Sequence, residues 1–237
     1  MPDLSALIIG GTSGIGRACA EKLLSQTFSV TLVGRDRVRA QAVATEMGGS
    51  VGVFAADAVD DASVEHLFAT IPPPDHVIVS LAGGSALGRF TDIGEEAFRR
   101  SLDTKLFAYL NVARHALRVL PRTGSLTFVT GVSGMRPAPG ASCLAVANMA
   151  IGGLIGTLAL EHAPLRVNGV APGTTDTPAW SRMPDDIRAA LFNDMASRTP
   201  LGRIATPQDV ADVVASLVAN SFLTGVIIPC DGGARLM

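Results

Sequence analysis

The chain has 237 residues, of which 48% are hydrophobic and 17% are charged, and its formal net charge at pH 7 is -2. This length and apolar content suffice for one large hydrophobic core, so a single domain over residues 1–237 is expected, and the charge argues against a nucleic-acid-binding surface. Three scattered cysteines exclude a disulfide framework, and no cluster has metal-ligand spacing, so we expect thiols in a reduced cytoplasm and no bound metal.

The first predicted element is an apolar strand, residues 4–9, which turns at once into a glycine-rich bend and a helix. The residue before this strand is the acidic Asp3 and no basic segment precedes it, so no signal peptide is expected. Gly10 would let the backbone turn off the strand, Gly14 would let it approach a pyrophosphate, and Gly16 would let the helix pack closely. Free N–H groups at the helix N-terminus suit phosphates. Because a strand and a helix flank the glycines, this stretch predicts a dinucleotide-binding turn.

Six further short apolar strands alternate with helices. They are predicted at 28–33, 51–55, 77–79, 125–130, 166–170 and 226–228. Helical patterns follow the first three strands and recur at 95–119, at about 141–161, at 185–197 and from 207 onward. No uninterrupted apolar stretch is expected to span a bilayer. This alternation predicts an α/β fold, a doubly wound parallel sheet with helices on both faces, whose ligands bind beyond the carboxyl ends of the strands.

Short motifs follow several of these strands. They are Asp57 after the third strand, Ala82-Gly83 after the fourth, the run Arg166-Val167-Asn168-Gly169-Val170-x-Pro172-Gly173-x3-Thr177, then Thr224-Gly225 and Asp231-Gly232-Gly233. Together with the glycine turn, and in this order and spacing, they resemble the short-chain dehydrogenase/reductase family over nearly the whole chain. The resemblance implies an NAD(P)-binding Rossmann fold, a homotetramer or homodimer, and a small-molecule substrate.

The resemblance also implies which residues contact the cofactor. They are Gly10, Thr12, Ser13, Gly14, Ile15, Gly16, Arg35, Asp57, Ala58, Ala82, Gly83, Pro172, Gly173 and Thr177. Among them, Asp57 would hold the adenine amine and Thr177 the nicotinamide amide. The alternatives are a helix N-cap at Asp57 and a turn hydroxyl at Thr177; we favour the cofactor roles.

The end of the second predicted strand indicates which nicotinamide cofactor is bound. An NAD site needs an acid there to accept from the ribose 2'-hydroxyl, but the position is Gly34 and the next residue is Arg35. Asp36 lies too far along and is interpreted as the N-cap of the following helix. Arg35, helped by Arg37, can donate to a 2'-phosphate, so NADP(H) is expected rather than NAD(H). A solvated surface arginine is the alternative.

The reactive centre departs from the family. The family uses a Tyr-x3-Lys pair on the long helix after the fifth strand, a serine before it, and an asparagine on the helix after the fourth strand. Here those positions fall on Leu144, Asn148, Gly131 and Lys105, and the single tyrosine, Tyr109, lies on the other helix. An alkyl side chain cannot carry the proton that the tyrosine transfers. The scaffold therefore matches the family, whereas the catalytic set does not.

Lys105 and Asn148 suggest a reciprocal exchange, because the lysine stands in the asparagine's place and the asparagine in the lysine's. We predict that Lys105 is the functional cation of the pocket and that partial burial lowers its pKa. We also predict that the Asn148 amide oxygen accepts a hydrogen bond from its ammonium. The alternative is that Lys105 reaches solvent and Asn148 only packs.

Several side chains near the reactive centre are candidates to replace the missing hydroxyl. They are Thr130, Ser133, Ser142 and Cys143. Ser133 is predicted to reach the substrate, since it lies on a loop two residues past the serine position. Ser142 and Cys143, at the start of the long helix, are expected to cap that helix or to pack against it. The candidate catalytic residues are therefore Lys105, Asn148 and Ser133.

Two later segments suggest further contacts. The adjacent glycines Gly152 and Gly153 in the long helix indicate close approach of another backbone, from a helix of the same chain or from a second subunit. The resemblance favours a subunit. Residues 174–200, which include Trp180 and Phe192, are expected to form an apolar lid over the substrate.

Three functions remain open from the sequence. The first is an NADP(H)-dependent oxidoreductase with a rearranged active site that acts on a small carbonyl or alcohol. The second is a redox-inactive, cofactor-binding regulatory or assembly subunit. The third is a non-redox dehydratase or isomerase that uses Lys105 as its base. No nucleic acid and no membrane is expected as a partner, and fold alone does not separate the three.

Overall fold

The computed structural model describes residues 4–48, 51–83 and 86–237, so Asp3 lies outside the described residues. A parallel seven-stranded sheet forms its centre, in the order β3-β2-β1-β4-β5-β6-β7. The strands are β1 (Ser5–Ile9), β2 (Ser29–Gly34), β3 (Val51–Ala55), β4 (His76–Val79), β5 (Ser125–Val129), β6 (Arg166–Pro172) and β7 (Ile227–Cys230). Each predicted strand is confirmed. The strand order reverses between β1 and β4, the point where such sheets bind ligands.

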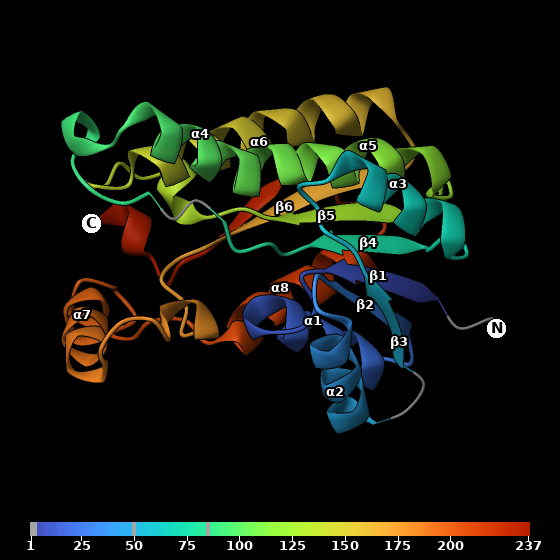
Figure 1. Ribbon diagram of the computed structural model, residues 1–237, viewed down its shortest axis with the longest axis horizontal. Helices are drawn as coiled ribbons and strands as arrows, with labels where there is room; N and C mark the ends of the chain where they lie inside the picture. The colour runs from blue at the N-terminus through green and yellow to red at the C-terminus, as the bar shows by residue number, and fades with distance from the viewer. Residues whose placement is uncertain (1–3, 49–50, 84–85) are drawn as a thin grey trace.

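Helices cover both faces of the sheet (Figure 1). They are α1 (Gly14–Ser25), α2 (Arg37–Met47), α3 (Asp61–Thr70), α4 (Glu95–Leu102), α5 (Ala108–Val119), α6 (Ser142–Glu161), α7 (Asp185–Ser197) and α8 (Pro207–Ala219). α3, α5 and α6 lie on one face, and α1, α2 and α8 lie on the other. α7 lies apart from both layers, beyond the carboxyl ends of the strands. The predicted doubly wound Rossmann fold is confirmed.

The strands are apolar throughout because they are buried on both sides. In β1, Leu7 and Ile9 belong to the core under α3, α5 and α6, whereas Ala6 and Ile8 belong to the core under α1, α2 and α8. Successive side chains of a strand point to opposite faces, so a strand that is covered on both sides needs apolar residues at every position. This is why short, wholly apolar runs predicted a parallel sheet.

The helical region predicted over 95–119 is interrupted by a wider turn. Between α4 and α5, residues Asp103–Phe107 form a π-helical turn. Lys105 lies in this turn and is only 6% exposed. The prediction that Lys105 lies near the core is therefore confirmed, and the alternative that it reaches solvent is wrong. The π-helical turn itself has no signature in the hydrophobic pattern.

α6 is long and apolar enough, by length and composition, to cross a membrane, contrary to the expectation that no such stretch exists. It is the one helix of the described residues that meets this test, and 39% of its most apolar window is buried within the protein. Its side chains Ile151 and Ile155 are fully buried in the core under α3, α5 and α6. Core packing on one side explains part of its hydropathy.

Candidate cofactor site and reactive centre

The turn between β1 and α1 has the backbone geometry of a phosphate site. Gly10 and Gly14 have φ values of +83° and +52°, in the region that favours glycine. A Cβ at Gly16 would collide with the carbonyl oxygen of Gly10, so the close approach expected there is present. Ser13 makes no side-chain cap on α1, and the first turn of α1 carries no acidic residue. The N–H groups at this helix end therefore suit an anion.

The segment after β6 lies against this glycine turn. A Cβ at Gly14 would lie 3.2 Å from Cβ and Cγ2 of Thr177. Pro172 is buried, and the N–H of Gly173 donates to the carbonyl of Cys230 at 3.0 Å, which fixes the start of the segment. The Thr177 side chain does not cap the turn that follows it, so the alternative of a turn hydroxyl is wrong.

Asp57 and Ala58 form the turn after β3. Asp57 Oδ1 accepts a hydrogen bond from a backbone N–H two residues on, at 3.1 Å, whereas the N-cap of α3 is Asp60. The N-cap alternative for Asp57 is therefore wrong, because α3 begins further along the chain. Asn111 of α5 donates from its amide to the carbonyl of Ala58 at 3.1 Å and holds this turn in place.

The loop after β4 lies on the π-helical turn. Ala82 is exposed, and a Cβ at Gly83 would collide with the carbonyl oxygen of Thr104, so glycine is needed for this approach. The residues predicted to contact the cofactor thus lie at or just beyond the carboxyl ends of β1, β2, β3, β4 and β6. The parallel sheet brings these separate motifs to one edge.

The end of β2 has no room for an acidic side chain. A Cβ at Gly34 would lie 2.8 Å from Cγ2 of Thr12, so Thr12 fills the space that an acid would need. Arg35 follows with an exposed side chain. Asp36 accepts hydrogen bonds from two backbone N–H groups of α2, at 2.9 and 3.1 Å, and the predicted N-cap is confirmed.

Lys105 lies at the carboxyl ends of β4 and β5. Its Nζ donates to the carbonyls of Leu81 and Val129, both at 3.1 Å, and to Tyr109 Oη at 3.0 Å. The predicted hydrogen bond to Asn148 is therefore wrong, because these three acceptors take all the protons of the ammonium. Burial lowers the pKa of Lys105 to about 7, as expected in direction.

Tyr109 is the partner of Lys105 that sequence reasoning missed. Its side chain is fully buried, and its hydroxyl donates to the carbonyl of Val129. Burial also raises the pKa of Tyr109 above its usual value, so this phenol is a poor acid at neutral pH. The sequence feature that indicates this contact is the spacing Lys105-x3-Tyr109, because residues four apart lie on one face of a helix.

Asn148 pairs with Ser133 instead. Its Nδ2 donates to Ser133 Oγ at 2.9 Å, so the structure brings together two of the three candidate catalytic residues. A Cβ at Gly131 would lie 2.7 Å from the same Nδ2. A serine side chain at position 131 would collide with the Asn148 amide in this arrangement, so the two cannot be present together. The carboxamide thus occupies the space of the family's serine and explains the glycine there.

The other candidate hydroxyl and thiol groups are engaged or enclosed. The Thr130 hydroxyl donates to the carbonyl of Val170 at 3.0 Å. Cys143 is fully buried, and the Ser142 hydroxyl is buried as well. Ser133 is half-buried, so it is the hydroxyl among these that a substrate can approach. Leu144 is also half-buried and carries no proton that it can transfer.

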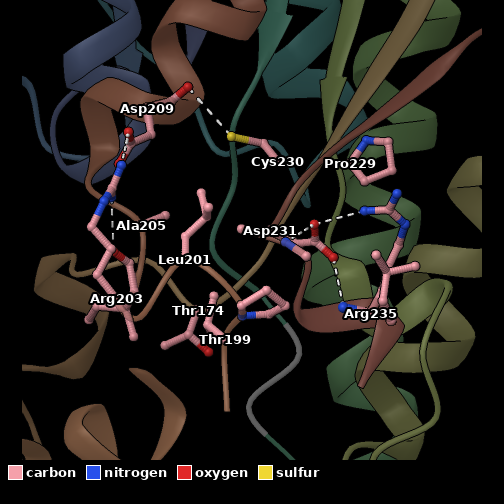
Figure 2. A pocket seen from close by; sticks show the side chains of 15 residues that line it. Thr174, Thr199, Leu201, Arg203, Ala205, Asp209, Pro229, Cys230, Asp231 and Arg235 are labelled. Atoms are coloured by element: carbon pink, nitrogen blue, oxygen red, sulfur yellow. Dashed lines mark hydrogen bonds and ion pairs between the residues drawn. The ribbon is translucent and has the colours of Figure 1, made fainter. Parts of the chain in front are cut away.

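A cavity of about 510 Å³ lies beyond the end of β7 (Figure 2). Ion pairs lie at its walls, Arg203 with Asp209 at 2.7 Å and Arg235 with Asp231 at 2.8 Å, so both carboxylates are neutralised. Burial raises the pKa of the Cys230 thiol, which also lines it. Lys105, Asn148 and Ser133 do not line this cavity, which separates it from the reactive centre.

The predicted lid contributes to this cavity through both of its ends. Thr174 and Thr199 of the segment 174–200 lie on its wall. Inside the segment, Trp180 contacts Phe192 edge to face, with ring centroids 5.6 Å apart. A role of 174–200 as a lid over substrate stays a prediction.

Comparison with known proteins places the chain among dehydrogenases and reductases. A family model described as enoyl-(acyl carrier protein) reductase matches residues 10–235. The short-chain dehydrogenase/reductase ATR9 of Stachybotrys chlorohalonatus is 31% identical over 98% of this chain and 97% of its own. Cis-4-hydroxycyclohexanecarboxylate dehydrogenase of Sinomonas cyclohexanicum is 30% identical over 96% of this chain and 95% of its own. A solved small-chain dehydrogenase in complex with NADPH is 32% identical, covers 99% of this chain and 100% of that chain, and has a TM-score of 0.86.

Proposed function

Because the chain belongs to the short-chain dehydrogenase/reductase family, we propose that it is an NADP(H)-dependent oxidoreductase that acts on a small carbonyl or alcohol. The end of β2 carries the choice of cofactor, since Thr12 fills the place of an acid beside Gly34 and Arg35 offers an exposed guanidinium. NAD(H) lacks the acceptor that it needs there. The related structure that holds NADPH supports the same assignment.

The residues of this chain have separate roles in the proposal. The glycine turn would hold the pyrophosphate, Asp57 the adenine amine, Arg35 the 2'-phosphate and Thr177 the nicotinamide amide. When bound, the cofactor supplies or accepts a hydride. Asn148 donates to one lone pair of Ser133 Oγ, so the hydroxyl proton of Ser133 is free to be donated to a carbonyl oxygen. Ser133 would thereby polarise the substrate.

One observation favours a second candidate, a cofactor-binding protein without redox turnover. Leu144 stands where the family keeps its proton-transferring tyrosine, and Tyr109 is enclosed in the core. A non-redox enzyme with Lys105 as base is less well supported, because all three hydrogen-bonding directions of its amine are already used. Measured turnover with bound NADPH separates the first two candidates.

The choice of cofactor is tested by replacing Arg35 with Ala. We expect wild-type protein to bind NADPH more tightly than NADH, and Arg35→Ala to lose about 1.5–3 kcal/mol of NADPH binding, the value of a charge-assisted hydrogen bond. NADH binding should stay unchanged. Cofactor fluorescence and thermal shift report both affinities. Arg39→Ala, which changes an exposed arginine in the first turn of the following helix α2, is the matched control and should keep the preference. Equal binding of both cofactors by the wild type would remove the proposal.

We further propose that a second copy of the chain covers the outer face of α6. Val146, Met149 and Leu160 on α6 are 46%, 64% and 84% exposed. A Cβ at Gly153 or Gly156 would meet nothing within 4 Å, so in the described part of the chain no other helix approaches these glycines. An exposed apolar face of this kind marks an interface.

Native mass spectrometry tests this assembly and reports any co-purifying nucleotide together with it. We expect a homodimer or homotetramer, and Gly153→Glu should shift it to the monomer because it places a charge on the apolar face. A monomeric wild type would contradict the proposed assembly.

We propose the cytoplasm as the location of this protein. Its three free cysteines fit that reduced compartment.

A further inference from the structure

The hydroxyl of Tyr109 joins three other parts of the chain inside the core. It accepts from the backbone N–H of Leu81 at 3.2 Å and from Lys105 Nζ at 3.0 Å. It donates to the carbonyl of Val129, while the carbonyl of Leu81 lies farther from it, at 3.4 Å. A phenol has one proton to donate and two lone pairs to accept with, so these contacts use all of its hydrogen-bonding capacity.

Leu81 is the residue at which the loop after β4 leaves the sheet. The N–H of Ser80 still donates to the neighbouring strand, to the carbonyl of Ile9 at 2.9 Å. One residue further, the N–H of Leu81 bonds to Tyr109 and its carbonyl accepts from Lys105 at 3.1 Å. Two buried side chains therefore fix both backbone polar groups of Leu81 at the point where the strand ladder gives way to the loop.

This loop lies between the glycine turn and the π-helical turn. A Cβ at Gly10 would collide with the carbonyl oxygen of Ser80 and would lie 3.3 Å from Cδ2 of Leu81. On the other side, a Cβ at Gly83 would collide with the carbonyl oxygen of Thr104. The contact with Gly10 falls between β1 and β4, where the strand order reverses. A shift of Leu81 would therefore move the loop against the turn that suits a phosphate.

We propose that Tyr109 is a positioning residue for the nicotinamide cofactor, because it holds Leu81, and with it Ala82 and Gly83, in place against the glycine turn. This inference rests on the proposed function, in which this edge of the sheet binds NADP(H). Tyr109 is fully buried, so it acts through the loop and not by touching a bound ligand. A loop that is already ordered in the free protein costs less free energy to order when the cofactor binds.

Tyr109→Phe tests this role, because it removes the hydroxyl and keeps the ring, which lies 5.8 Å from that of Phe128. We expect NADPH to bind about tenfold more weakly, the usual worth of one neutral hydrogen bond. We also expect the Leu81 amide of the apo protein to exchange with solvent about tenfold faster or more. Cofactor fluorescence and hydrogen exchange followed by NMR are the measurements, at a temperature where circular dichroism shows each protein folded.

Ser125→Ala is the matched control. Ser125 begins the strand β5 that ends at Val129, and its buried hydroxyl bonds to His76 at the opposite end of the sheet from Tyr109. This variant also loses a buried hydrogen bond, so its stability should fall, but its NADPH affinity and Leu81 exchange should stay unchanged. An equal loss of affinity in both variants, or an unchanged affinity in Tyr109→Phe, overturns the proposal.

If Tyr109→Phe does not fold, the wild-type sequence provides the test, because the chain contains a single tyrosine. Growth with 3-fluorotyrosine labels Tyr109 alone, and its fluorine resonance should shift when NADPH saturates the protein. A resonance that does not respond overturns the proposal. Failure of the proposed function is a separate result, since wild-type protein would then bind no NADPH. In that case Leu81 exchange in the apo proteins decides whether Tyr109 holds the loop.

Discussion

We expect wild-type protein to reduce acetophenone with NADPH about 10²–10⁴-fold more slowly than a Leu144→Tyr/Asn148→Lys variant, the range that general acid–base catalysis contributes. Leu144 has no proton to transfer, and the two changes restore the pair on which the family relies. The change at 148 also removes the carboxamide from the space beside Gly131. Steady-state kcat/KM is the measurement.

The matched control is Leu144→Phe/Asn148→Lys, which adds the ring without the hydroxyl and should leave the rate low. A wild-type rate as high as that of the tyrosine variant would show that another group already supplies the proton. Ser133→Ala would then be measured first, because Ser133 is half-buried, whereas Cys143 is fully enclosed. If NADPH binds and neither protein turns over, the redox-inactive candidate is favoured.

The second large effect concerns the buried amine of Lys105. Its pKa is lowered from 10.5 to about 7, whereas the unfolded chain keeps the ordinary value, so the unfolded state binds more protons between these limits. The free energy of unfolding therefore rises with pH across this window, by about 2 kcal/mol between pH 7 and 9. Lys105→Met keeps the length of the stem and removes the titration, so this rise should disappear.

Urea denaturation at pH 7, 8 and 9 measures this difference. Burial raises the pKa values of Cys19, to about 12, and of Tyr109, which affects both proteins at higher pH, so the comparison stops at pH 9. Lys22→Met, which removes the other lysine from an exposed ion pair, should keep the rise. Parallel pH profiles for wild type and Lys105→Met would contradict the buried, titrating amine.

The same variant tests the role of Lys105 in function. The ammonium holds the carbonyls of Leu81 and Val129, at the ends of the two strands next to the predicted nicotinamide position. Without it we expect weaker NADPH binding or loss of activity. Unaltered cofactor affinity and activity in Lys105→Met would limit the residue to a structural role. We expect the same change to alter the stability of the apo protein as well, because the amine has three buried hydrogen-bond partners.

The sequence by itself determined the parts of this protein that depend on neighbouring residues. Apolar runs gave the seven strands, and the glycine turn gave the start of α1 together with its close contact between Gly10 and Gly16. Asp36 was predicted as an N-cap because capping needs only a side chain and backbone N–H groups two and three residues away. The register of the family's motifs located Lys105, Asn148 and Ser133, but not their partners.

Only the tertiary structure decided which side chains meet. Lys105 was paired with Asn148 on the sequence, yet the π-helical turn aims its amine at carbonyls of β5 and the loop after β4, while Asn148 turns toward Ser133. Periodicity reports which face of an element is buried, not which of several buried acceptors a long side chain reaches. That choice depends on how three separate elements pack, and it decides the chemistry of this reactive centre.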